Sequence, residues 1–204
     1  MGIMKGAIVR QPNKSKNSAF KVLTVDGATE ALNVIDYVHH EIHEGSHYHY
    51  SNFFTLAAKS SASSTAYIHL AVPNTTKWPH ITMGVGANLG LIYARMYEGI
   101  TFASAASYGS VAASPAVINN NRNVTSTNGL IVYTSPTIAS LKTQIMAQAI
   151  GTTGFKTAAA GTGTREDELL LKQNTRYAIA LANQHSAAQT VNLSLNWYEH
   201  THRN

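Results

Sequence analysis

Several short segments after residue 45 alternate apolar and polar residues. In the clearest of them, residues 191–198, every second side chain is apolar and the side chains between them are polar. The apolar ones are Val191, Leu193, Leu195 and Trp197, and the polar ones are Asn192, Ser194 and Asn196. A period of two residues is typical of a strand that buries one face and exposes the other. We therefore predict a strand at residues 191–198 with an exposed face of asparagine and serine.

Similar segments follow one another at intervals of roughly ten residues, separated by turn residues. They predict strands at residues 66–72, 80–85, 91–102, 129–133 and 176–182. Residues 141–150 are ambiguous, because their glutamine and alanine residues favour a helix. Residues 158–164, rich in alanine, glycine and threonine, are expected to form a flexible loop. Many short strands with regular turns predict a sandwich, a jelly roll or a barrel.

The sequence pattern before residue 45 is compatible with two kinds of secondary structure. Val34, Val38 and Ile42 recur at a four-residue spacing, as they would on one face of a helix that Gly45 could end. The β-branched residues of the segment favour extended chain instead. We expect a short helix or an irregular segment over residues 28–43.

The composition is polar but poor in charge. Only 12% of the 204 residues are charged, against about 25% in an ordinary soluble domain. Ser, Thr and Asn together fill 54 positions, and there is no cysteine. The lack of cysteine excludes disulfides, thiolate metal sites and thiol catalysis. A neutral polar surface of this kind suggests a protein that functions within an assembly.

Basic residues are concentrated near the N-terminus, before the first acidic residue, Asp26. They are Lys5, Arg10, Lys14, Lys16 and Lys21. We predict a basic arm over residues 1–25 that contacts an acidic protein surface, and a β-sandwich domain over residues 26–204. No nucleic-acid partner is expected, because the remaining ten basic and ten acidic residues balance and form no basic stripe. No membrane association or leader segment is expected, because no apolar stretch approaches the roughly 20 residues that a membrane helix needs.

Residues 39–50 contain five of the ten histidines of the chain. In a strand, His47 and His49 would point to the same face and could bind a metal ion together. Neither these residues nor the His-Thr-His of residues 200–202 is followed by the glutamate that a cupin metal site requires. Three interpretations remain: a packed surface at a subunit or capsid contact involving His43, His47 and His49, a structural metal shared across a symmetry axis, or catalysis. Clustered imidazoles also predict an assembly that is sensitive to acid.

Residue pairs for acid–base catalysis are scarce. Between Glu44 and Glu166 the sole acidic residue is Glu98, whereas a glycosidase needs two facing carboxylates. The glycines match neither the dinucleotide fingerprint nor a phosphate loop, and there is no nucleophile elbow. We expect no catalytic residues and no cofactor.

The loop at residues 119–123 is the next candidate contact. Its residues are Asn119, Asn120, Asn121, Arg122 and Asn123. Asparagine tolerates left-handed backbone and bonds to its own main chain, so these residues shape a tight loop. Arg122 is the sole charged residue between Gly99 and Leu141, and its five donors require acceptors within the fold or on a neighbour. The loop is therefore either a solvated turn or a subunit contact.

Several segments, taken in order along residues 24–201, carry a resemblance to a known family. They are VDGATEALNVIDYVHHEIHEGSHYHY, residues 73–78 followed by His80, the loop at residues 119–123, residues 165–168 with residues 171–177, and residues 197–201. Together they resemble a family of tailed-bacteriophage structural proteins, the capsid decoration or cement proteins. The resemblance implies a β-rich, jelly-roll-like fold, frequent trimers, a position on the outer shell and no catalytic residues.

On this basis we expect an all-β, jelly-roll-like sandwich with an extended N-terminal arm and at most one or two short helices. The expected function is to bind the major capsid protein and to stabilise the shell as a homotrimer that bridges neighbouring capsid subunits. The expected location is the outer capsid surface of a virion, after synthesis in the cytoplasm of the bacterial host. The alternative is a head-fibre or tail domain that binds a receptor or glycan, with Trp78 and Tyr97 stacking on sugar rings. A metal-dependent enzyme at the histidine cluster is a third hypothesis.

Overall fold

The structure, a computed structural model, gives the backbone of residues 8–9, 21–22, 37–112, 116–151, 159–162 and 168–201. Side chains are described in residues 40–112, 116–151 and 168–201. The chain divides into two compact units, Met1–His40 and Glu41–Asn204. In the first unit β1 (Ile8–Val9) pairs antiparallel with β2 (Lys21–Val22). The arm boundary expected after residue 25 stays a prediction.

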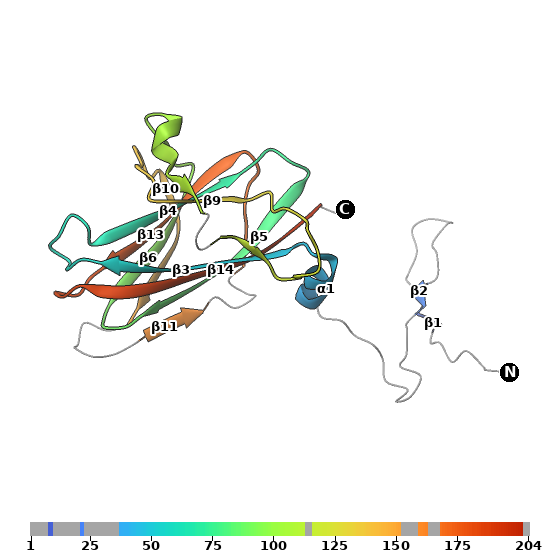
Figure 1. Cartoon of the computed structure of the whole chain (residues 1–204), viewed down its shortest axis with the longest axis horizontal. Coiled ribbons are helices and arrows are strands. Elements are labelled where there is room, and N and C mark those ends of the chain that lie inside the picture. Colours follow the sequence, from blue (N-terminus) through green and yellow to red (C-terminus); the bar gives the residue numbers. More distant parts are fainter. Residues whose placement is uncertain are drawn as a thin grey trace. The chain divides into compact units, whose positions relative to one another are not determined.

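The second unit is built from two antiparallel sheets (Figure 1). The β13 sheet has the order β10 (Thr143–Ile150), β6 (Ile92–Glu98), β13 (Thr175–Asn183), β4 (Thr65–Val72), β9 (Ile131–Thr134) and β7 (Ser110–Val111). The β14 sheet has the order β11 (Ala159–Thr162), β5 (Lys77–Ala87), β14 (Gln189–Thr201), β3 (His47–Leu56) and β8 (Ile118–Asn119), with β12 (Leu169–Leu170) also paired to β5. In the described residues the helices are α1 (Tyr37–Glu44) and the 3₁₀ turn η1 (Ala105–Tyr108). The expected all-β fold with one or two short helices is confirmed.

The strand order is that of a jelly roll. In chain order, β3, β4, β5 and β6 alternate between the two sheets, β10 lies beside β6, and β11, β13 and β14 alternate again. As a result, β3, β14, β5 and β11 form one four-stranded block, and β4, β13, β6 and β10 form the other. Two facing blocks connected in this way are two interleaved Greek keys.

The core lies between the sheets and follows the predicted alternation. The apolar residues of β14, Val191, Leu193, Leu195 and Trp197, are all buried. They face the buried side chains of the β13 sheet, which include Ile68, Leu70, Ile179 and Leu181. The intervening Asn192, Ser194 and Asn196 remain partly exposed on the outer face. The strand predicted from sequence at residues 191–198 is thus the middle of β14, and its two faces lie as expected.

In three segments the structure decides between the alternatives that the sequence left open or corrects the prediction. The ambiguous residues 141–150 contain β10, because pairing with β6 along most of its length outweighs their helical propensity. The flexible loop expected at residues 158–164 is wrong, because residues 159–162 form β11 on the edge of β5. Backbone hydrogen bonds hold this segment whatever its side chains. Of the segment expected at residues 28–43, residues 28–36 lie outside the described residues. The rest belongs to the helix α1, which ends at Glu44 before Gly45, whose φ of 74° is left-handed.

Neither helix in the described residues is both long enough and apolar enough to cross a membrane.

Candidate binding surfaces

The asparagine loop lies against the junction between α1 and β3. Asn119 Nδ2 donates to the carbonyl of Gly45 at 2.8 Å, and Asn121 Nδ2 donates to the carbonyl of His43 at 3.0 Å. Within the loop, the amides of Asn121 and Asn123 donate to the side-chain oxygens of Asn119 and Asn121. The structure therefore brings two separately predicted segments together, and it uses the asparagine side chains to hold the loop in place.

His47 and His49 are two residues apart in β3 and both lie on its outer face, as the spacing predicts. His47 is buried and its Nδ1 accepts a hydrogen bond from Asn120 Nδ2 at 2.7 Å, while Nδ1 of the half-buried His49 donates to Asn196 Oδ1 at 2.9 Å. Burial, reinforced by the charge of His49 and opposed by that of Glu41, lowers the pKa of His47. These contacts make His47 and His49 part of a hydrogen-bonded surface that includes the asparagine loop.

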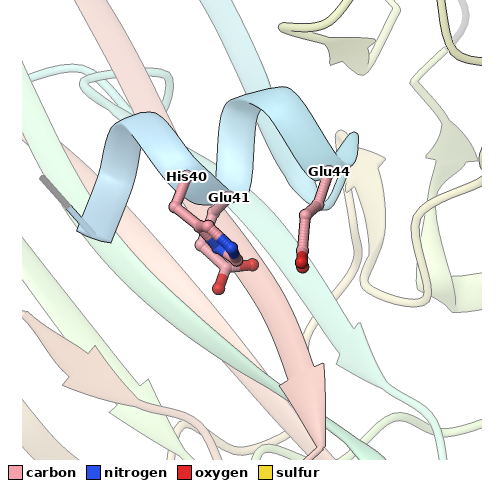
Figure 2. Close-up of side chains that lie close together, drawn as sticks. All are labelled: His40, Glu41 and Glu44. Carbon is pink, nitrogen blue, oxygen red and sulfur yellow. The ribbon is translucent and has the colours of Figure 1, made fainter. Parts of the chain in front are cut away.

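The metal-ligating side chains that converge in the described residues belong to α1. Ligand atoms of His40, Glu41 and Glu44 lie within 4.8 Å of one another, and Figure 2 shows all three side chains on the same side of the helix. Glu41 is buried and accepts a hydrogen bond from the Ser46 hydroxyl, which stabilises the turn into β3. His47 and His49, the predicted metal candidates, do not belong to this group.

The predicted cationic contacts are only partly described. Lys5, Arg10, Lys14 and Lys16 lie outside the described residues, and Lys21 lies in β2 without a described side chain. Arg122 is exposed.

A cluster of aromatic rings that the sequence reasoning missed lies on the outer face of the β14 sheet. His80 stacks on Tyr198 and on His200, with ring centroids 4.6 Å apart in both pairs. Glu168 Oε1 accepts hydrogen bonds from His80 Nδ1 at 2.5 Å and from the Tyr198 hydroxyl at 2.6 Å. The register of β5 and β14, which places His80 opposite Tyr198, creates the cluster.

Next to this cluster, the described rows of the outer face carry small uncharged residues and one exposed ring. Ser194 lies between Ser51 and Gly84, and in the next row Asn192 lies between Phe53 and Gly86. Phe53 is 71% exposed, the largest exposed fraction among the large hydrophobic residues whose side chains are described. An exposed ring among small neutral side chains is suited to close contact with another protein surface.

The outer face of the β13 sheet carries a second cluster of rings. His69 is fully buried, stacks on Tyr133 at 4.8 Å, and contacts Phe102 and Tyr108 at 4.6 and 5.5 Å. Its Nδ1 donates to the carbonyl of Tyr108 at 3.2 Å, and its Nε2 is buried without a hydrogen-bond partner. Burial is the main reason why the pKa of His69 falls to about 4; the nearby charge of Arg176 lowers it further, and the hydrogen bond to Tyr108 opposes both.

We expect His69 to make the fold sensitive to acid. Its folded pKa of about 4 lies below the ordinary histidine pKa of 6.5, so between these pH values the unfolded chain binds more protons than the folded one. The free energy of unfolding should therefore fall from pH 6.5 to pH 4, by about 3 kcal/mol at most from this residue. Urea unfolding at several pH values measures the slope. The variant His69→Phe keeps the ring stacking and should show a smaller slope, and an equal slope in both proteins would contradict this role.

The two aromatic residues proposed to stack on sugars lie on different sheets. Trp78 lies on β5 opposite His200, next to the ring cluster of the β14 sheet, and Tyr97 lies on β6 opposite Ala178. Both are partly exposed. They therefore do not form one sugar-binding surface.

No family model matches the chain, and no curated protein matches it.

Proposed function

We propose that the protein is a structural virion protein that decorates the outer shell of a tailed-bacteriophage capsid. In this role it forms homotrimers, binds the major capsid protein and bridges neighbouring capsid subunits. The proposal draws on the sequence resemblance to decoration proteins, and the jelly-roll sandwich of the second unit is compatible with it. It assigns the protein no catalytic reaction and no cofactor.

The observation that carries this proposal is the uncharged part of the outer face of the β14 sheet, beside the ring cluster. The rows around Ser194 and Asn192 contain small polar side chains and glycines, with Phe53 exposed at their edge. Such a face hydrogen-bonds to another copy or to a shell subunit, often through water, without charge repulsion between repeated copies. Repetition around a capsid then adds avidity to each modest contact.

The buried and half-buried carboxylates support a structural role. Glu199 accepts hydrogen bonds from backbone amides, and Glu168 binds His80 and Tyr198. Glu98 forms an ion pair with Lys172 at 2.6 Å and accepts a hydrogen bond from the Tyr177 hydroxyl. Each of these carboxylates thus has a role in holding the fold together.

The basic arm supplies the test of capsid binding. Deleting residues 1–21 removes five positive charges, and it should weaken binding to purified capsids by roughly tenfold at low salt, because the arm adds attraction to an acidic shell. Co-sedimentation with capsids over a salt series measures this. The matched control is a full-length variant in which the five basic residues of the arm are changed to glutamine. It should bind capsids as weakly as the deletion does. Undiminished occupancy by both proteins, with their β content unchanged, would contradict the role of the arm.

A second candidate function is glycan binding by a head-fibre or tail domain. The observation that favours it is a cavity on the outer face of the β13 sheet, bordered by two tyrosines and an arginine. Particle images distinguish the two functions, because a fibre domain would lie away from the faces of the shell.

A further inference from the structure

The cavity on the β13 sheet has the size and lining of a small-ligand site. Its volume is about 500 Å³, within the range of about 300–1,000 Å³ that is typical of ligand pockets. It lies where the ends of β4, β6 and β13 meet β9 and η1. Its lining includes Pro73, Gly99, Tyr108, Tyr133, Asn174 and Arg176.

The aromatic part of the lining is held rigidly. Tyr133 stacks on the buried His69 at an interplanar angle of 12°, and Tyr108 meets both Phe102 and Tyr133 edge-on. Phe102 packs against Tyr108, and His69 packs against both tyrosines, but neither Phe102 nor His69 lines the cavity. Rings fixed in this way lose little side-chain entropy when a ligand packs against them.

Arg176 supplies a positive charge in the lining of the cavity. Its guanidinium carbon lies 4.5 Å from the centre of the Tyr108 ring, and its Nη2 donates to the Tyr108 hydroxyl at 2.5 Å. Arg176 is exposed and forms no ion pair with a carboxylate of the described chain. A guanidinium has five N–H donors, so one contact to Tyr108 leaves enough to bind a carboxylate with two parallel hydrogen bonds.

We infer that this cavity binds a saccharide that carries a carboxylate, such as a uronic or sialic acid unit. The carboxylate pairs with Arg176, and the apolar face of the sugar ring packs against the side chains of Tyr108 and Tyr133. Asn174, whose φ of 49° marks a tight turn at the rim, offers an amide for sugar hydroxyls. A concave site of this volume accommodates a small sugar better than a protein surface. The inference rests on the second candidate function, glycan binding at this cavity, and is independent of the proposed capsid role.

Isothermal titration calorimetry of the full chain tests the inference, with trigalacturonate and sialyllactose as acidic probes and maltotriose and lactose as their neutral counterparts. At least one acidic sugar should bind about tenfold or more tightly than its neutral counterpart. Arg176→Gln should remove that preference, and Arg176→Lys should restore it only in part, because lysine keeps the charge but not the paired donors. Arg95→Gln is the matched control: Arg95 lies on the same sheet, over the Tyr93 ring at 4.9 Å, outside the cavity lining.

Four results would overturn the inference. They are no heat of binding with any of the four sugars, equal affinity for acidic and neutral sugars, equal losses in Arg95→Gln and Arg176→Gln, and displacement of the bound sugar by a single-stranded oligonucleotide. Because Arg176 is exposed, its variants should unfold at the temperature of the parent protein, so lost binding reports on the site itself. Capsid binding by Arg176→Gln should equal that of the parent, which separates this inference from the proposed function.

Discussion

Replacing Glu199 by glutamine is expected to lower the free energy of unfolding by about 3 kcal/mol. Glu199 is only 3% exposed and lies near the C-terminal end of β14. Its carboxylate accepts hydrogen bonds from the amides of Gly129 and Leu130 at 2.7 and 2.8 Å, and from Trp197 Nε1 at 3.1 Å. A glutamine would place its NH₂ group, which is itself a donor, against one of these donors. The NH₂ group would then be buried without an acceptor. Urea unfolding at pH 7 measures the loss.

The matched control is Glu44→Gln, on an exposed side chain of α1. It should change the free energy of unfolding by no more than about 0.5 kcal/mol. Gly129→Ala gives an independent check of the same anchor, because a Cβ at residue 129 would lie 2.9 Å from Glu199 Oε2. If Glu199→Gln costs less than about 1 kcal/mol, the carboxylate does not anchor this loop.

Replacing Phe53 by lysine is expected to weaken self-association of the protein by about a hundredfold or more. Phe53 is the most exposed large hydrophobic residue described, and it lies beside Asn192 on the face that we propose to contact another copy or a shell subunit. If the contact is with another copy, Phe53 is its apolar anchor. A lysine removes the apolar anchor and adds one positive charge per copy, and these charges repel one another when copies meet. Sedimentation equilibrium of the parent and variant proteins measures the change.

Val111→Lys is the matched control for this variant. Val111 is 60% exposed on β7 of the β13 sheet, so the substitution makes the same change in charge on the other face of the sandwich. Both variants should keep the stability of the parent, because both side chains are exposed. Equal dissociation of the two variants, or an unchanged oligomer in Phe53→Lys, would show that the β14 sheet is not the contact.

Sequence periodicity predicts most clearly the strand whose two faces differ. The strand at residues 191–198 is correct, and there every second side chain is buried while those between are partly exposed. The strands at residues 66–72 and 176–182 are also correct, although in β13 residues 177–183 are buried on both faces. β10 was ambiguous because its glutamine and alanine residues favour a helix. β11 was missed because alanine, glycine and threonine give no contrast between faces. Their structure comes from pairing with β6 and β5 rather than from their own residues.

The candidate sites also include features that the sequence predicted and features that it did not. The positions of His47 and His49 on one face of β3 follow from local spacing and could be predicted. The contacts of His80 with Tyr198, or of Arg176 with Tyr108, join residues far apart in the chain. Such contacts depend on strand register and on the path of the η1 segment, and no local pattern in a single sequence encodes these. The asparagine loop was recognised as a loop, but its position against α1 and β3 was not predicted.

Electron cryomicroscopy of particles that contain the protein tests the central claim most directly. The account predicts density for the β sandwich on the outer faces of the shell, in symmetric groups of three that span neighbouring capsid subunits. The same density should be absent from particles assembled without the protein. Density confined to the tail or head fibres, or a shell that is identical with and without the protein, would contradict the account.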